Sequence, residues 1–183
     1  MNEVKNNRNE DEGMANTLEI KLLSDNATKP KRAYDSAGYD IYAAENKILE
    51  PQEKALIATD LAVNIPQGYV GLLTSRSGVS SKTHLVVETG KIDAGYQGHM
   101  KINIKNDYDD DGAETIFLRD ISNEKIFEEK RNLYKRGSYK IQKGDRLAQL
   151  VIVPIWTPEL ETVEEFESES ARGEKGFGSS GTR

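Results

Sequence analysis

Apolar and polar residues alternate along short stretches of this chain, and this alternation constrains the fold more than any other feature. Within residues 99–105, for example, apolar side chains at 100, 102 and 104 alternate with polar ones at 101, 103 and 105. Successive side chains of a β-strand point to opposite faces, so the pattern predicts strands with one buried face. Turn signals such as Pro66-Gln67-Gly68 and Lys143-Gly144-Asp145 separate the runs.

Many short strands with few helices favour an all-β sandwich or barrel. A short helix is predicted at one place, residues 123–136, where four large side chains would share a face and Gly137 suits the position after its end. Ser122 is a suitable cap for its start. Strands are expected at 17–23, 39–43, 54–64, 69–74, 84–87, 99–105, 115–118, 138–141, 147–155 and 161–166.

The length of 183 residues predicts one domain. Residues 1–16 are expected to be a disordered tail, with Met14 as an alternative start, because the segment is mostly polar and has no periodicity. The β domain is expected at 17–166, followed by a flexible glycine- and serine-rich arm at 167–183. Neither a secretory signal nor a transmembrane helix is expected, since no suitable apolar run is present.

Composition excludes several classes of chemistry. The sequence has no cysteine, so disulfides, thiolate metal sites and cysteine nucleophiles are excluded, which fits a reducing cytoplasm. The net charge of −6 argues against general nucleic-acid binding. A small anionic substrate is still compatible with this charge, because a few arginines and backbone amides can hold a triphosphate within an acidic protein.

The glycine-rich end of the chain, residues 176–181, matches the spacing GxGxxG. A dinucleotide fold is not predicted, because that fold needs a strand before the motif and a helix after it. The glycines, together with Ser179 and Ser180, are suited to close over a phosphate, and Arg172 supplies a charge just upstream. A flexible tail without a ligand is the alternative interpretation.

Two internal turns carry candidate catalytic side chains. An apolar strand runs into Ser75-Arg76-Ser77-Gly78, which resembles an anion-binding turn, although a surface turn with an incidental arginine is the alternative. Asp93 lies between two glycine-containing turns, where a carboxylate either braces the turn or acts as a general base on water. The run from Asp107 resembles a calcium loop, but Leu118 replaces the Glu required at the twelfth position, so an acidic surface loop is favoured.

Five motifs together resemble those of the homotrimeric dUTPase family. Each is a weak signal alone, whereas all five in the family's order are specific, and they extend over most of the chain. In order they are AGYDI at 37–41, SRSG at 75–78, GKIDAGYQG at 90–98, GDRLAQL at 144–150 and RGEKGFGSSG at 172–181.

The resemblance implies a β jelly-roll subunit and a homotrimer, with three active sites at the subunit junctions and a C-terminal arm that crosses to another subunit. It also implies hydrolysis of dUTP to dUMP and pyrophosphate, which limits uracil in DNA and supplies dUMP for thymidylate synthesis. The implied cofactor is Mg²⁺, held mainly by phosphates and waters, with Asp40 in its outer shell. The expected location is the cytoplasm of a bacterial host cell, with neither nucleic acid nor membrane as a partner.

The resemblance assigns catalytic and phosphate-binding roles. Asp93 matches the residue that deprotonates the water attacking the α-phosphorus, while Arg76 and Arg172 would stabilise charge on the transferring group. Gln149 matches a hydrogen-bonding position on the phosphate side. The remaining phosphate cradle would consist of Ser77, Gly78, Gly178, Ser179 and Ser180.

Selection of the base and sugar is assigned to a hairpin over residues 84–93, which would read the uracil edge through backbone groups and includes Gly90 and Ile92. Tyr96 would pack against deoxyribose and exclude a 2′-hydroxyl, and Phe177 would stack on the uracil face. Lys101 is a further expected substrate-binding residue.

Two features depart from the family pattern. Val87 stands where many members have Asn, so uracil recognition is expected to rely more on the main chain. Residues 107–138 form a large insertion that resembles the insertion of dUTPases carried by staphylococcal phages, in which the enzyme also binds a repressor of mobile genetic islands. The insertion is either a docking site for such a repressor or an extended surface loop with no partner.

Two other functions are compatible with the sequence: a primarily regulatory, nucleotide-sensitive binding protein, and a dCTP deaminase of the same fold. The deaminase would need different base-reading and catalytic residues. The uracil-type hairpin and the complete glycine-rich tail argue against it.

Overall fold

The computed structural model describes residues 17–130 and 132–168. Short strands dominate this part of the chain, and one helical turn, α1 (Ser77–Ser80), interrupts them. The expected all-β class is therefore confirmed. The strands are β1 (Glu19–Leu22), β2 (Tyr39–Tyr42), β3 (Lys47–Leu49), β4 (Lys54–Asn64), β5 (Tyr69–Ser75), β6 (Leu85–Val87), β7 (Gly90–Ile92), β8 (Met100–Asn106), β9 (Glu114–Thr115), β10 (Leu118–Arg119), β11 (Lys125–Ile126), β12 (Tyr134–Lys135), β13 (Tyr139–Ile141) and β14 (Arg146–Pro154).

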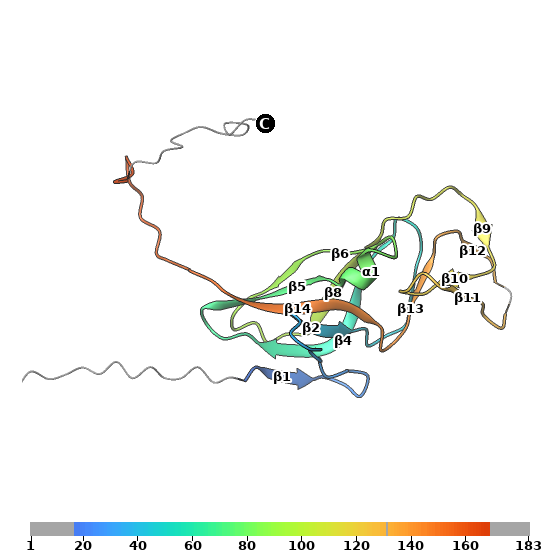
Figure 1. Cartoon of the computed structure of the whole chain (residues 1–183), viewed down its shortest axis with the longest axis horizontal. Helices are drawn as coiled ribbons and strands as arrows, with labels where there is room; N and C mark the ends of the chain where they lie inside the picture. The colour runs from blue at the N-terminus through green and yellow to red at the C-terminus, as the bar shows by residue number, and fades with distance from the viewer. Residues whose placement is uncertain (1–16, 131, 169–183) are drawn as a thin grey trace, which may run out of the picture.

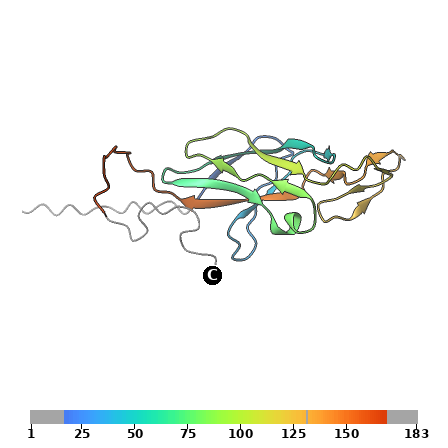
Figure 2. The same cartoon turned by 90° about the horizontal axis from the view of Figure 1, so that it is seen from above.

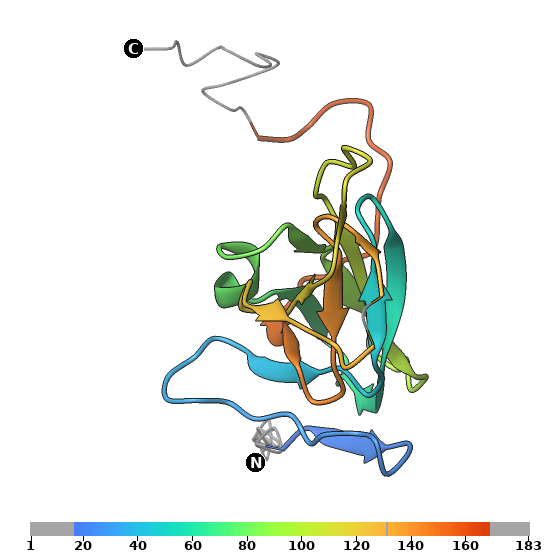
Figure 3. The ribbon, with the colours of Figure 1, turned by 90° about the vertical axis from the view of Figure 1, so that its right-hand side faces the viewer.

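Two antiparallel four-stranded sheets form the body of the molecule (Figure 1). One has the strand order β1-β4-β8-β6 and the other the order β2-β14-β5-β7. Figure 3 views the body from one end, with the strands of both sheets around a common interior. In both sheets, neighbouring strands are often far apart in sequence, so motifs from distant parts of the chain come to lie side by side.

The core lies between the two sheets and follows the alternation in the sequence. In β8 the side chains of Met100, Ile102 and Ile104 are buried, whereas Lys101 between them is exposed. The same hydrophobic cluster includes Ile41 of β2 and Leu150 of β14, which join it from the opposite sheet. Alternation therefore determines which face of each strand packs inward.

The insertion forms a lobe at one end of the molecule, opposite the end at which residues 155–168 leave the body (Figure 1 and Figure 2). Strand β9 pairs with β12, and β10 pairs with β11 in a hairpin. Strand β10 also pairs in parallel with β13, through Arg119 and Tyr139, and so extends the sheet that ends in β3.

The predicted helix at 123–136 is wrong, because this segment contains β11 and β12 instead. Leu118 is fully buried opposite Ile126, and the Phe117 and Phe127 rings lie 5.8 Å apart, so cross-strand packing replaces the expected helical face. Asn123 adopts a positive φ of 69°, which fits the tight turn of a hairpin and not a helix.

The strand predicted at 161–166 is also wrong. Residues 155–168 form no strand, because no other strand of the described chain lies beside them, and large side chains such as Trp156, which is 87% exposed, remain uncovered. The strand predicted at 115–118 is divided between β9 and β10. Strands β3 and β7 were not among the predicted strands.

The described residues leave part of the expected domain organisation as a prediction. The N-terminal tail at 1–16 and most of the expected arm lie outside them. In the described segments, no helix has the length and apolar character needed to cross a bilayer.

Candidate active site

Asp40 is the centre of a charged cluster built from three of the sequence motifs. It lies in β2, where it pairs with Gln149 of β14, and Gln149 in turn pairs with Thr74 at the end of β5. The non-sequential strand order β2-β14-β5 therefore brings the first, second and fourth motifs together. The Asp40 side chain is buried, with 6% of its residue surface exposed.

Three side chains donate hydrogen bonds to the Asp40 carboxylate. Nε of Arg76 lies 2.8 Å from one carboxylate oxygen, and the Gln149 amide nitrogen lies 3.3 Å from the same oxygen. The Arg146 guanidinium lies 3.4 Å from the other oxygen. Two arginines around one aspartate leave a net positive charge, which suits a phosphate group.

Arg76 occupies the junction between β5 and α1. Its backbone is extended, with φ −80° and ψ 133°, and the next residues form the helical turn Ser77–Ser80. Ser77 and Gly78 are exposed, and no atom lies within 4 Å of the place where a Cβ on Gly78 would stand. The turn is therefore open to solvent, and its expected role in binding an anion stays a prediction.

Arg146 is a residue that the motif analysis did not single out. Besides its contact with Asp40, its carbonyl oxygen accepts a hydrogen bond of 3.3 Å from Arg76. The signal was present in the sequence, because Arg146 lies in the fourth motif directly before the strand expected at 147–155. Only the pairing of β14 with β2 shows that it faces Asp40.

Asp93 lies in an exposed turn directly after β7. Its carbonyl accepts a hydrogen bond from the amide of Tyr96, and Gly95 closes the turn with a positive φ of 79°. Gly90 and Ile92, the predicted base-reading residues, form the ends of β7 and pair with β5.

Asp93 and Arg76 lie at opposite ends of β5. Ile92 pairs with Gly71, whereas Arg76 follows the last residue of β5, five positions further along the chain. Asp93, one residue beyond Ile92, would stand opposite Val70, six positions before Arg76, so at about 3.3 Å per residue the separation along β5 is roughly 20 Å. Within one chain the two residues are therefore too far apart to act on the same phosphorus.

Tyr96 projects from the turn after Asp93 and is 47% exposed. Its hydroxyl donates a hydrogen bond of 3.2 Å to the carbonyl oxygen of His99. A Cβ on Gly98 would stand 2.5 Å from that hydroxyl, so the absence of a side chain at 98 lets the ring fold back. Lys101, the other expected binding residue in this region, is exposed on β8 opposite Ala58.

Asp145, which directly precedes Arg146 of the charged cluster, has a raised pKa. Burial raises the pKa of Asp145 above its ordinary value of 3.8, while a hydrogen bond from the amide of Gln142 opposes the shift and the nearby charge of Asp120 adds to it. Asp145 precedes Arg146, and its carbonyl accepts a hydrogen bond of 2.9 Å from Ala43. The turn that presents Arg146 is thus tied to the strand end next to Asp40.

The side chains around Asp40 fit a metal ion held through water better than one bound directly to protein oxygens. Across the described segments, no group of three His, Asp or Glu side chains is arranged to hold a metal ion. Both oxygens of Asp40 already accept hydrogen bonds from neighbouring side chains. A Mg²⁺ carried by phosphates, with Asp40 in its outer shell, is compatible with this arrangement.

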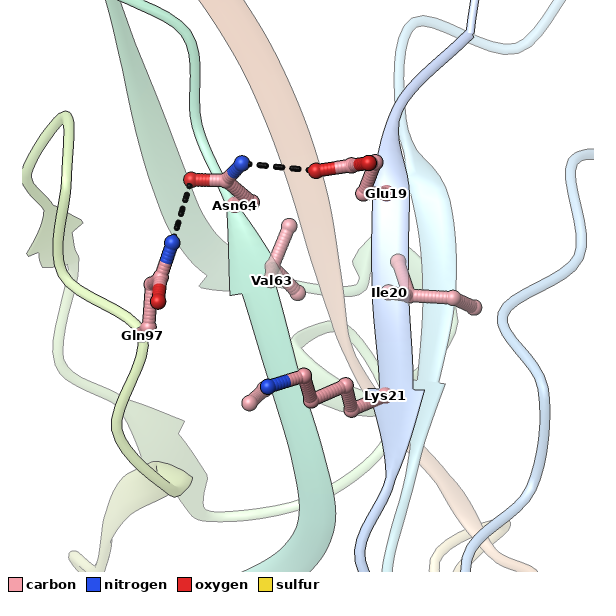
Figure 4. A pocket seen from close by; sticks show the side chains of 7 residues that line it. Glu19, Ile20, Lys21, Val63, Asn64 and Gln97 are labelled. Carbon is pink, nitrogen blue, oxygen red and sulfur yellow. Dashed lines mark hydrogen bonds between the residues drawn. The ribbon is translucent and has the colours of Figure 1, made fainter.

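A half-open pocket of about 360 Å³ lies away from the charged cluster, between β1, β4 and the turn after Asp93 (Figure 4). Asn64 connects its two sides, accepting a hydrogen bond of 3.2 Å from Gln97 and donating one of 2.8 Å to Glu19. No predicted catalytic residue lines it.

The fifth motif lies outside the described residues. This applies to Arg172, Phe177, Gly178, Ser179 and Ser180, so their predicted roles stay predictions. The structure brings together Asp40, Arg76 and Gln149, with Ser77 and Gly78 beside them, and it separates this group from Asp93 and Tyr96.

Comparison with known proteins gives consistent matches. The model of the dUTPase family matches residues 25–112 and 133–181, and the gap between these segments lies within the insertion. A deoxyuridine 5′-triphosphate nucleotidohydrolase of Debaryomyces hansenii is 36% identical over 168 residues, covering 90% of this chain and 88% of that protein. One from Mycolicibacterium vanbaalenii is 33% identical over 175 residues, covering 92% of this chain and 97% of that protein.

Solved structures show a closer similarity. The dUTPase of Staphylococcus bacteriophage 80alpha, solved with dUpNHpp, is 73% identical in sequence and superposes with a TM-score of 0.88. The match covers 91% of this chain and 99% of that chain. Another structure of that enzyme is 72% identical, with a TM-score of 0.82 over 84% of this chain and 100% of that chain. Phage dUTPases are described there as controlling the transfer of virulence genes by a proto-oncogenic G protein-like mechanism.

Proposed function

Since this chain belongs to the dUTPase family, we propose that it hydrolyses dUTP to dUMP and pyrophosphate with the help of Mg²⁺. The observation that carries this proposal is the cluster in which Asp40 orients Arg76 beside the open turn at Ser77 and Gly78. A positively charged side chain held by a buried carboxylate is prepared to bind a phosphate without reorganising.

The phosphates would bind at this cluster and at the exposed turn. The guanidinium groups of Arg76 and Arg146 carry charge that is only partly neutralised by Asp40. Mg²⁺ bound to the phosphates would withdraw charge toward the leaving pyrophosphate. Asp40 would hold this ion through water, because direct coordination would require it to release its arginine partners.

Asp93 would act as the general base. Its exposed position after β7 gives its carboxylate access to water, and the turn closed by Gly95 limits its orientation. The proton of the attacking water would pass to this carboxylate as the water oxygen approaches the α-phosphorus, in line with the departing pyrophosphate.

The separation of Asp93 from Arg76 along β5 supports an active site shared between subunits. A homotrimer would place Asp93 of one subunit beside Arg76 of another. The arm, with Arg172, Phe177 and Ser179, would then come from a third. The exposed apolar side chains of residues 155–168 support a partner for this segment, because Trp156 and Leu160 are uncovered in the single chain.

Recognition of uracil would rely on backbone groups of the hairpin over 84–93. Val87, which replaces the Asn of many family members, is buried in the core and pairs with Ile104. Its side chain is therefore turned away from any ligand, which leaves the polar backbone groups of the hairpin to satisfy the uracil edge.

A turnover assay tests the proposed activity. Pyrophosphate release from dUTP should require Mg²⁺ and should greatly exceed release from dTTP, dCTP or UTP. Asp93→Asn should lower kcat by about a hundredfold or more, the scale of a lost general base. Unchanged release in this variant would refute the role of Asp93, and ammonia release from dCTP would identify a deaminase instead.

We further propose that the insertion docks a repressor of mobile genetic islands. Phe127, which is 63% exposed, stands next to Phe117 on the outer lobe. The insertion also exposes Ile116 and Leu133. Apolar side chains grouped on a surface favour a protein partner. The similar phage dUTPase is described as having SaPI inducing capacity.

Deleting residues 109–136 tests the docking site. Gly137 and the Tyr108 ring flank the deletion and lie in contact, so the two chain ends can be joined there. The deletion should keep dUTP hydrolysis and lose binding to the purified repressor. Phe127→Ser should weaken binding, whereas Leu22→Ser, at a similarly exposed apolar residue on β1, serves as the control. Normal binding by the deletion variant would defeat the docking proposal.

A further inference from the structure

A β-bulge interrupts the pairing of β4 with β8 beside the third motif. Ala58 pairs with Lys101 and Leu61 pairs with Met100, so two residues of β4 have no partner in β8. One of them, Asp60, has a positive φ of 51°. A non-glycine residue in this conformation has to be held by its surroundings, and such sites cluster near functional regions.

The His99 side chain holds this bulge. Its Nε2 atom accepts a hydrogen bond of 3.0 Å from the backbone N–H of Asp60 and lies 3.3 Å from the Asp60 carboxylate. Ser24 donates a hydrogen bond to the other oxygen of that carboxylate. The imidazole is therefore fixed against β4 by a bond that requires an acceptor at Nε2.

The main chain of the same residue holds Tyr96. The phenol donates to the carbonyl oxygen of His99 at 3.2 Å, and the ring lies over Gly98. Residue 99 thus has two connections: its side chain is bound to the bulge in β4, and its carbonyl receives the Tyr96 hydroxyl. A displacement of His99 would move the acceptor that locates the ring.

We propose that His99 is a positioning residue that fixes Tyr96 against the bulge at Asp60 and thereby sets the discrimination between 2′-deoxyribose and ribose. The inference rests on the proposed function, in which Tyr96 packs against the sugar. A ring that is held at its hydroxyl end cannot move aside for an added 2′-hydroxyl. A ring that has lost this support can move aside, so ribonucleotides would then be accepted as substrates.

The test compares kcat/KM for dUTP with kcat/KM for UTP. His99→Ala removes the acceptor for the Asp60 amide and should lower the dUTP preference by about tenfold, the factor expected from one lost hydrogen bond of ordinary strength. The change should appear mainly in the KM values. His99→Gln, whose amide oxygen can replace Nε2 as acceptor, should restore the preference to within about threefold of the original.

Asn132→Ala is the control, because Asn132 is an exposed residue of the insertion whose amide bonds Tyr134 and belongs to neither the bulge nor any proposed substrate contact. It should leave the preference unchanged. A loss of thermal stability in His99→Ala without a change in preference would show a purely structural role and would overturn the inference. Equal loss of preference in His99→Gln and His99→Ala would overturn it as well.

The experiments distinguish failure of the proposed enzymatic function from failure of the positioning role of His99. Absence of dUTP turnover in the unmodified protein would refute the enzyme and, with it, the role of His99. Normal dUTP turnover with an unaltered dUTP preference in His99→Ala would refute the positioning role alone.

Discussion

Asp40 is the residue on which the charges of the candidate site converge. It is buried between β2 and β14, and its carboxylate accepts hydrogen bonds from Arg76, Arg146 and Gln149. A buried carboxylate needs such partners, since an unpaired charge at that position would be very unfavourable. The same contacts fix the direction of Arg76, so the proposed phosphate binding would depend on the same side chain as the local stability.

We expect Asp40→Asn to lower kcat/KM for dUTP by about ten- to a hundredfold, because a hydrogen bond to a charged group contributes about 1.5–3 kcal/mol. The variant has similar volume but no negative charge to orient two arginines. Steady-state pyrophosphate release gives the measurement, and Asp109→Asn, an exposed carboxylate in the insertion, is the control. Full activity in Asp40→Asn would contradict the assigned role.

Asp145 gives a prediction for the dependence of stability on pH. Burial raises the pKa of its carboxyl in the folded state above the ordinary 3.8, so the folded protein binds this proton more tightly than the unfolded chain. The ionised group therefore opposes folding at neutral pH, and this penalty decreases as the pH falls through the raised pKa.

Asp145→Asn keeps an oxygen to accept the amide of Gln142 but carries no charge. We expect its free energy of unfolding to equal or exceed that of the unmodified protein at pH 7, and any advantage to shrink on acidification toward pH 3.8. Urea unfolding at several pH values provides the measurement. A deficit in stability that stays constant with pH would contradict the assignment.

At the scale of elements, the insertion is attached to the body by a buried amide. The Asn106 side chain donates to the carbonyl oxygens of Leu49 and Gly137, at 3.1 and 2.9 Å, and accepts from the amide of Tyr108 at 3.1 Å. These partners lie at the end of β3 and at the two ends of the insertion. One side chain therefore sets the place where the inserted lobe leaves and rejoins the sheet.

Asn106→Ala should reduce the free energy of unfolding by about 2–3 kcal/mol, because buried backbone groups lose their partners. The matched control is Asn132→Ala, since Asn132 is an exposed residue of the insertion whose amide donates to Tyr134 at 3.3 Å. Denaturant titration of both variants gives the measurement. Similar stability in the two variants would show that the buried amide does not anchor the insertion.

For the molecule as a whole, the proposed sharing of the active site between subunits is the main prediction that the fold supports. Asp93 follows β7 and lies near the opposite end of β5 from Arg76. Residues 155–168 leave the body of the molecule (Figure 1), and their large apolar side chains, such as Trp156, are exposed. Both features are explained if each active site is completed by residues of a neighbouring subunit. A single chain would then hold only separate parts of the site.

Mixing two inactive variants tests this sharing. Asp93→Asn and Arg76→Ala chains should each be nearly inactive, but co-refolded mixtures should recover activity, because some sites combine an intact Asp93 from one chain with an intact Arg76 from another. For equal mixing of subunits, about a quarter of the sites should be intact. A mixture that shows only the summed activity of the separate variants would place both residues in one chain's site.

The all-β class and most of the long strands could be predicted from the sequence, because alternation of apolar and polar residues is a local property that specifies the buried face of a strand. The sequence also indicated Arg76, Asp93 and Gln149 through their motifs. The wrong prediction at residues 123–136 also has a local origin, because their apolar pattern is compatible with a helical face. In the structure, Leu118 pairs with Ile126 and the Phe117 ring contacts the Phe127 ring, so this part of the segment packs as a β-strand.

Which motifs meet became clear only from the three-dimensional fold. Strands β2, β14 and β5 are neighbours in space although they are distant in the chain, and their pairing places Arg146 and Gln149 beside Asp40. The same sheet separates Asp93 from Arg76. Pairing partners depend on how all apolar faces pack into one core, so they follow from the whole chain and not from the spacing of any motif.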